Sequence, residues 1–235
     1  MYSLLITLLL LLGTALCAPV SASPITFAFT GNVISVSAPL SGTFNTSQTL
    51  SGFYTFESTT PDTVPLDATL GFYTGALTAL SFTVGSYTGT LGPAPPGSAI
   101  AVENNRVFVF EPLPRNSYTV GAGFVGPDAA GLSPLFVSVV SVFDPTGTAL
   151  NSDSLPTTPP NLSAFTQGLG FALIFGDPDF PEDEQQVRGT LTSLTLVTEP
   201  PEGTPIPEPS TWLLLSSGLA GIAVWRQRQR QSHSA

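Results

Sequence analysis

Short apolar runs of period two, broken by Gly, Pro, Asn and Asp, fill the chain from residue 24 onward and limit its fold more than any other feature. In the stretch TALSFTVGSYTG, Leu80, Phe82 and Val84 fall on one face of a strand, and Gly85-Ser86 supplies a two-residue turn. No stretch of ten or more residues here follows the helical period. These runs predict strands.

A second stretch, ITFAFTGNVISVS, alternates over residues 25–29 and then changes phase to Ile34 and Val36. A strand that changes phase needs an extra residue or a reversal. We therefore expect a bulge or a tight turn near Gly31-Asn32.

Some runs are apolar at consecutive positions, at residues 107–110, 135–143 and 171–175. Such runs predict central strands that are covered on both faces. Proline-rich turn clusters separate the runs, and their prolines end the backbone hydrogen bonding between strands. About ten short strands at this spacing predict an all-β fold, a jelly-roll-like β-sandwich over residues 23–198.

Charge limits the partners of this domain. The chain has 16 acidic and 6 basic residues, and three of the basic ones, Arg226, Arg228 and Arg230, lie in the last ten residues. A body without a basic surface has few cations to neutralise phosphates, so we expect no nucleic-acid partner. We also expect no cofactor.

The start of the chain has the pattern of a secretory signal peptide. Residues 4–16 form an apolar run that is too short for a comfortable membrane span, and small residues follow it. Residues 1–22 are therefore the predicted signal peptide, with cleavage after Ala22. Cleavage after Cys17 is the alternative. Acylation of Cys17 as a lipoprotein is disfavoured by Leu16. Because Cys17 is the only cysteine, the mature body would have no disulfide and no thiolate.

The end of the chain combines four features in order. Pro207-Glu208-Pro209 closes a proline-rich linker (199–209), an apolar segment follows (210–225), and a basic tail ends the chain (226–235). The segment predicts a single transmembrane helix, and we single out five of its residues as the membrane anchor: Trp212, Leu213, Leu214, Leu215 and Trp225.

These features resemble the PEP-CTERM sorting signal of Gram-negative bacteria. The resemblance implies that an exosortase cuts near the motif, after export by the Sec machinery, and that the protein passes from the inner membrane to the envelope, surface or extracellular matrix. It also implies a setting in which exopolysaccharide, and hence a biofilm, is made. The body, with SGFYTF and GTLTSLTL, is more loosely similar to bodies in this family.

Physical chemistry is consistent with that resemblance. Residues 211–225 would make a helix of about 22 Å, shorter than a hydrocarbon core of about 30 Å. The following arginines would keep the C-terminus in the cytoplasm. Proline keeps the preceding residues extended, as a protease-like site requires. The alternative is a permanent single-span anchor.

An acidic cluster, GDPDFPEDE, is a weak calcium candidate. Its carboxylates belong to Asp177, Asp179, Glu182, Asp183 and Glu184, and calcium takes 6 to 8 oxygen ligands. The cluster lacks the residue order of a calcium loop, and two prolines stiffen it. The alternative is a solvated loop that keeps neighbouring strand edges apart by charge.

Catalysis has little support in the sequence. Glu103 and Glu111 flank a hairpin-like stretch and would suit a glycoside hydrolase only if their carboxyl groups lay about 5 to 10 Å apart. His233, the only histidine, lies beyond the apolar C-terminal segment, so the body has no Ser-His-Asp triad. We expect no catalytic residues and no enzyme activity, and a structural or adhesive role.

Two non-catalytic alternatives remain. Aromatic side chains could stack on sugars as a carbohydrate-binding module, and six are available: Phe53, Tyr54, Phe72, Tyr73, Tyr87 and Tyr118. Sheet edges with few charges could instead pair with another chain, unless the proline-rich loops cover them.

Overall fold

The computed structural model describes residues 24–93, 97–108, 111–177 and 180–198. Ten strands and two short 3-10 helices, η1 (Ala38–Gly42) and η2 (Leu162–Ala164), make up this part of the chain. The strands are β1 (Pro24–Val36), β2 (Thr49–Glu57), β3 (Leu70–Thr74), β4 (Leu77–Val84), β5 (Tyr87–Leu91), β6 (Ala99–Phe108), β7 (Glu111–Val125), β8 (Ser133–Asp144), β9 (Gln167–Asp177) and β10 (Phe180–Leu196). The prediction of an all-β fold is confirmed.

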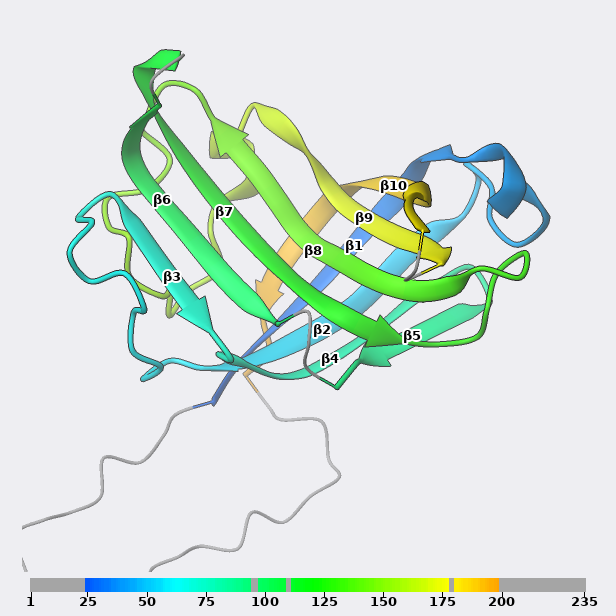
Figure 1. Ribbon diagram of the computed structural model, residues 1–235. Coiled ribbons are helices and arrows are strands. Elements are labelled where there is room, and N and C mark those ends of the chain that lie inside the picture. The colour runs from blue at the N-terminus through cyan, green and yellow to red at the C-terminus, as the bar shows by residue number, and fades with distance from the viewer. Residues whose placement is uncertain (1–23, 94–96, 109–110, 178–179, 199–235) are drawn as a thin grey trace, which may run out of the picture. The chain divides into compact units, whose positions relative to one another are not determined.

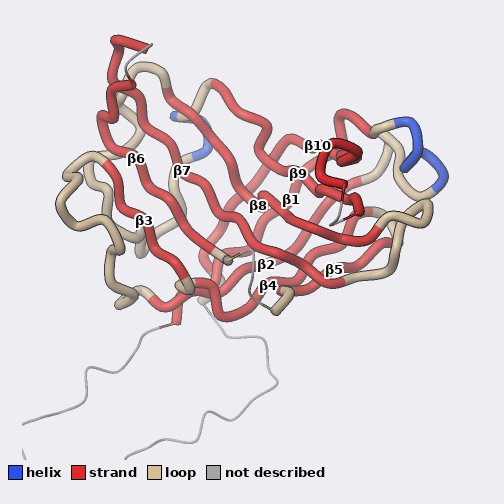
Figure 2. Tube along the Cα trace, viewed as in Figure 1, coloured by secondary structure: helices blue, strands red, loops and turns tan. Residues whose placement is uncertain are grey.

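All ten strands belong to one antiparallel sheet, in the order β3-β6-β7-β5-β4-β2-β1-β10-β9-β8. β7 also pairs with β8, so the sheet closes on itself. Figures 1 and 2 show the result as two layers, with β3, β6, β7, β8 and β9 facing β5, β4, β2, β1 and β10. Most neighbours in the sheet are consecutive in the chain, so the strand order is not that of a jelly roll, whose strands form two separate sheets.

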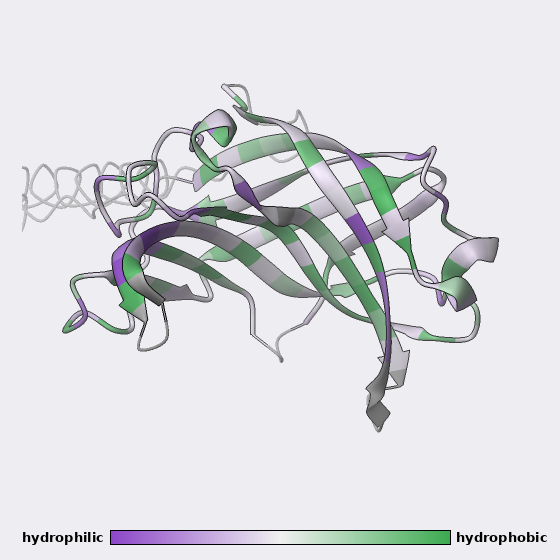
Figure 3. Cartoon of the chain, turned by 90° about the horizontal axis from the view of Figure 1, so that it is seen from above, coloured by the Kyte–Doolittle hydropathy of each residue, from purple (hydrophilic) through white to green (hydrophobic). Residues whose placement is uncertain are grey.

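Alternation along the strands explains why the sheet folds over its own core. In β2, Leu50, Tyr54 and Phe56 are buried, whereas Ser51 and Thr49 are exposed. The same alternation of apolar and polar residues runs along the strands in Figure 3. A strand with one apolar face buries that face against another layer, which fixes the register. The predicted turn at Gly85-Ser86 is confirmed, because Val84 pairs with Tyr87 and Gly85 has a φ of 60°.

Aromatic rings fill the space between the two layers. Phe171 of β9 lies 6.4 Å from Phe29 of β1 and 6.0 Å from Phe82 of β4, between ring centroids. Phe82 in turn meets Phe124 of β7 edge to face at 5.3 Å. Each ring removes a large apolar area from water, and edge-to-face pairs add to that stabilisation.

Two details of the strand prediction need correction. β1 keeps its phase as far as Val33, which is buried, whereas Ile34 is 53% exposed. The register shifts against β10 lie at Thr30/Gly31 and at Val33/Ser35, so a bulge near Gly31 is confirmed but no turn interrupts the strand. In the run at 107–110, Val107 near the end of β6 is 59% exposed and so is not covered on both faces, and residues 109 and 110 lie outside the described residues.

The chain divides into two units, Met1–Thr198 and Glu199–Ala235. In the first unit, the beginning of β1 and the end of β10 are neighbours: Phe27 pairs with Leu196, and the Val197 amide donates to the Thr26 carbonyl at 2.9 Å. In the part of the chain that the structure describes, no helix is long and apolar enough to cross a membrane.

Candidate functional site

The sequence-predicted targeting residues lie outside the described residues. These are Ala22 and everything from the sorting motif to the basic tail, including Pro207, Glu208, Pro209 and Arg226. The structure does define where the body stops, at the end of β10 beside β1. Residues 199–206 separate Thr198 from Pro207, a span of at most about 30 Å for an extended chain. The motif therefore follows the folded body closely.

The two carboxylates considered as a glycosidase pair, Glu103 and Glu111, belong to one hairpin. Glu103 pairs with Ser117 across the β6–β7 hairpin, whereas Glu111 pairs with Phe108, five residues further along β6. Five strand residues span about 16 Å between the backbone positions, and the side chain of Glu111 lies outside the described residues. The hairpin register thus separates the two backbone positions along its length.

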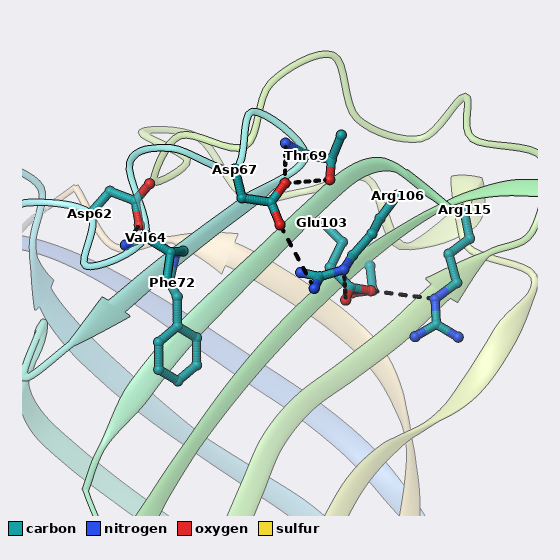
Figure 4. Close-up of polar contacts among 9 residues, drawn as sticks. Asp62, Val64, Asp67, Thr69, Phe72, Glu103, Arg106 and Arg115 are labelled. Carbon is teal, nitrogen blue, oxygen red and sulfur yellow. Dashed lines mark hydrogen bonds and ion pairs between the residues drawn. The ribbon is translucent and has the colours of Figure 1, made fainter. Parts of the chain in front are cut away.

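Glu103 is instead the centre of an ion-pair cluster on β6 and β7 (Figure 4). Its Oε2 accepts a hydrogen bond from Ser117 Oγ at 2.7 Å and lies 3.4 Å from Arg115 Nε. Its Oε1 lies 3.7 Å from Arg106 Nε. The Glu103 side chain is only 13% exposed, so these partners compensate for its loss of hydration.

Asp67 extends this ion-pair cluster into the loop before β3. Its Oδ2 lies 3.8 Å from Arg106 Nη2, and its Oδ1 accepts from the amide and the hydroxyl of Thr69. The Thr69 hydrogen bonds, assisted by the charge of Arg106, lower the pKa of Asp67 below its usual range. The cluster joins the loop before β3 to the β6–β7 hairpin. Both of its carboxylates, those of Asp67 and Glu103, already have partners.

A buried aspartate holds the loop after β8. The Asp144 side chain is almost fully buried, and its two oxygens accept hydrogen bonds from the amides of Thr146, Thr148 and Ala149 and from both threonine hydroxyls. Burial alone would raise the pKa of Asp144, but these hydrogen bonds outweigh it and lower the pKa well below its usual range. Neighbouring Asn116 is also buried and donates to the Leu150 carbonyl at 2.9 Å.

The calcium candidate is not tested by these contacts. β9 and β10 meet at the Asp177 and Phe180 pair, which places the acidic cluster at the tip of a hairpin. Asp179 and the side chains of Asp177, Glu182 and Asp183 lie outside the described residues. Among the side chains that are described, no three His, Cys, Asp or Glu groups gather closely enough to hold a metal ion.

The edge of β3 is covered by the loop before it. β3 lies at one end of the strand order, where an open edge would invite pairing with another chain. The Phe72 amide donates to Asp62 Oδ1 at 2.9 Å, and the Phe72 carbonyl accepts from the amide and the hydroxyl of Thr63. Figure 4 shows Asp62 placed against this strand. Both backbone groups of Phe72 that a new strand would need are therefore occupied.

Of the six aromatic residues considered for sugar stacking, four belong to the core: Tyr54, Tyr73, Tyr87 and Tyr118 are all buried. The hydroxyls of Tyr54 and Tyr118 hydrogen-bond across the two layers at 3.0 Å. Burial is the main cause that raises the pKa of each of these two phenols well above its usual value. Phe53 and Phe72 are half-buried and lie at outward positions of opposite layers.

An open hollow of about 440 Å³ lies beside Tyr118. Val102, Thr148–Ser152 and Ser154–Asn161 complete its lining, and Asp153, the charged residue of this loop, is not part of it.

The outward face of β5, β4, β2, β1 and β10 is covered by hydroxyl groups, and we call it the hydroxyl face. Its members are Thr26, Thr30, Thr49, Ser51, Thr55, Thr78, Ser81, Thr83, Thr88, Thr90, Thr190, Thr192 and Thr195. One row crosses four strands through the pairs Thr88–Thr83, Thr83–Ser51 and Ser51–Thr30. Phe53, between Ala28 and Ser81 on the neighbouring strands, is the aromatic residue of this face.

Cross-strand hydrogen bonds order the hydroxyl face. Ser51 and Thr83 lie 3.0 Å apart, Thr30 and Thr192 3.1 Å, and Thr26 and Thr55 2.9 Å, between side-chain oxygens. Sequence reasoning missed this face. The signal was present as pairs of Thr or Ser two residues apart, such as Thr49 and Ser51 in β2, Ser81 and Thr83 in β4, and Thr190 and Thr192 in β10, but only strand pairing shows that these positions share one surface.

Comparison with known proteins identifies the end of the chain. A family model described as the PEP-CTERM protein-sorting motif matches residues 205–229. No curated protein and no solved structure gives a significant match to the chain. The match covers the Pro207-Glu208-Pro209 triplet, the apolar segment and two of the tail arginines, Arg226 and Arg228. The protein is therefore one that carries a C-terminal PEP-CTERM sorting motif, which implies export and processing by an exosortase, a membrane protease, in a Gram-negative bacterium.

Proposed function

We propose that this protein is an exported, non-enzymatic β-sheet protein with a structural or adhesive role in the envelope, at the cell surface or in the extracellular matrix. The sorting motif at the end of the chain carries this proposal. In it, residues 1–22 direct export through the Sec machinery, and the apolar segment holds the precursor in the inner membrane until the exosortase cuts near Pro207-Glu208-Pro209.

The placement of the body's two ends supports a delivery role for both flanking segments. Because β1 begins beside the end of β10, the signal peptide and the sorting tail leave from neighbouring strands. Because the motif comes after the end of β10, cleavage near it does not require the body to unfold. The rest of the body is then free to contact a partner.

The bound state of the carboxylates supports a non-enzymatic role. Glu103 is held by Ser117, Arg106 and Arg115, and Asp144 by the loop that follows it. A general acid or base must be able to reach a substrate and exchange a proton with it. These side chains stabilise the hairpin and the loop instead, which favours a structural role for the body.

The covered edge of β3 favours adhesion through a face over growth of a fibre. Strand addition at that edge would need to displace Asp62 and Thr63 from Phe72. The hydroxyl face carries no such cover from the described residues. We therefore place the contact surface of the body on a sheet face.

The test is fractionation of the native host. A variant with Pro207-Glu208-Pro209 changed to Ala-Ala-Ala is compared with one in which Pro200-Pro201-Glu202 is changed in the same way. The second triplet has the same residue types and lies in the same linker, but outside the matched motif. We expect the first variant to accumulate in the inner membrane and the second to be sorted like the wild type. Equal sorting of both variants would contradict the proposal.

A further inference from the structure

We propose that the hydroxyl face binds a neutral polysaccharide, with Phe53 as the ring on which a sugar stacks. This inference rests on the adhesive role proposed above and names its ligand class. Three properties of the face carry it: its hydroxyl groups, its lack of charge and its single aromatic ring.

The hydroxyl groups match a polyhydroxylated ligand. In a bonded pair such as Thr30 with Thr192, one O–H donates to the other oxygen, so the second O–H and several lone pairs remain to face solvent. Sugar hydroxyls have the same dual character. Outward residues repeat every 6 to 7 Å or so along a strand and at about 4.8 Å between strands, which gives an extended chain many equivalent contacts.

The scarcity of charge selects among polymers. Glu57, at the end of β2, is the only charged residue of β1, β2, β4 and β5, and β10 has none from Gly189 to Leu196, with Arg188 directly before that stretch. The chain as a whole has a net charge of −10. A polyanion would be repelled by the body, and a polycation would find no counter-charge on the face. A neutral chain has neither disadvantage.

Phe53 supplies what hydroxyls alone lack. Hydrogen bonds to a sugar replace hydrogen bonds to water, so their net contribution is modest. Phe53 is half-buried at an outward position of β2, flanked by the small side chains of Ala28 and Ser81. The negative face of its ring attracts the C–H groups of a sugar and removes apolar surface from water.

A second copy of the chain and a lipid surface fit the face less well. Stable protein interfaces have an apolar, aromatic core, and here a single phenylalanine stands among hydroxyls. Binding to an anionic membrane needs clusters of lysine or arginine, and the five strands hold a single one, Arg188 in the middle of β10.

The experiment is affinity electrophoresis of the mature protein from its host, in gels that contain dextran, laminarin or alginate. The test variant is Phe53→Ala, and Phe72→Ala, which removes the half-buried phenylalanine of the opposite layer, is the matched control. Phe53→Tyr and the double variant Thr30→Val/Thr83→Val complete the set, and they keep the strand propensity of the face.

We expect at least one neutral glucan to retard the wild type, Phe53→Tyr and Phe72→Ala equally. Phe53→Ala should weaken the affinity about tenfold, and the threonine pair about fivefold, as loss of one to two weak contacts predicts. If Phe53→Ala does not fold, the threonine pair carries the comparison, and Phe53→Tyr remains the control that keeps the ring.

Three results would overturn the inference: no retardation by either glucan, retardation by alginate alone, or equal retardation of the wild type, Phe53→Ala and the threonine pair. None of them touches sorting, which fractionation tests separately. Conversely, a protein that binds glucan but is insensitive to the sorting-motif change would remove the proposed delivery and leave this ligand class in place.

Discussion

The two outer faces of the body are both poor in charge but carry different kinds of polar side chains. On β6 and β7 the chain gathers Glu103, Arg106 and Arg115 into one cluster that reaches Asp67 in the neighbouring loop. On the opposite layer, Thr and Ser supply most of the polar side chains of the hydroxyl face. The comparison indicates that charged side chains of this chain stabilise loops and hairpins, whereas the hydroxyl face is exposed and can contact a partner.

If that contrast is correct, the largest loss of stability should come from replacing a buried polar side chain that holds a loop. Asp144→Ala would leave the amides of Thr146, Thr148 and Ala149 without their acceptor, and we expect a loss of about 3 kcal/mol in the free energy of unfolding. Chemical denaturation measures it. Asp128→Ala, at an exposed aspartate, is the control and should change stability by less than about 0.5 kcal/mol.

The same aspartate should make the body sensitive to acid. Its pKa is lowered in the folded state, so its contribution is fully present above the ordinary carboxyl pKa and is lost as the pH falls below that value. We expect the difference in stability between the wild type and Asp144→Ala to shrink between about pH 4 and pH 2. A constant difference across this range would contradict the assigned hydrogen bonds.

The second largest effect should come from the contact that joins the two layers. Tyr118→Phe would leave the Tyr54 hydroxyl buried without its partner, at a cost of about 1 to 2 kcal/mol. Tyr54→Phe/Tyr118→Phe should cost less than the sum of the two single changes, because both polar groups are then gone. Strict additivity in this double-mutant cycle would argue against the hydrogen bond.

A smaller loss is expected on the charged face. Glu103→Gln keeps an acceptor for Ser117 but removes the charge that faces Arg106 and Arg115, and we expect a loss of about 1 kcal/mol. High salt should reduce this difference, because part of it is electrostatic. Thermal unfolding at low and high ionic strength measures both quantities, and a loss that is unchanged by salt would contradict the ionic role.

The smallest effect should be on the hydroxyl face. Thr83→Val replaces a hydroxyl by a methyl group at an exposed strand position, and stability should change by less than about 0.5 kcal/mol. Glucan binding by the same variant should weaken. If Thr83→Val instead destabilises the body as much as Glu103→Gln, the hydrogen bonds of the hydroxyl face stabilise the fold as well. The contrast between the two faces would then be wrong.

Much of the fold followed from local pattern. The alternation around Leu80, Phe82 and Val84 and the Gly85-Ser86 turn predicted one hairpin of the sheet, because period and turn chemistry are local properties. The strand order was beyond reach, since closure through the β7–β8 pairing depends on contacts between distant residues. Val107 misled because an exposed apolar residue near the end of a strand has the same local pattern as a buried one.

The candidate sites divide in the same way. The sorting motif is a contiguous signal, so the sequence alone was enough to find it. The separation of Glu103 from Glu111 depends on hairpin register, and the hydroxyl face depends on five strands lying side by side. Asp144 could have been noticed from its local sequence DPTGT, because aspartate followed by threonine two residues later favours a side-chain-capped turn.

The most direct test of the account is the intact mass of the mature protein from its native host, measured beside the variant in which Pro207-Glu208-Pro209 is Ala-Ala-Ala. The account predicts that the native protein lacks the signal peptide and the residues that follow the motif, while the variant keeps its tail through Ala235. A native protein that also retains Thr211 to Ala235 would show the tail to be a plain anchor and would contradict sorting by cleavage.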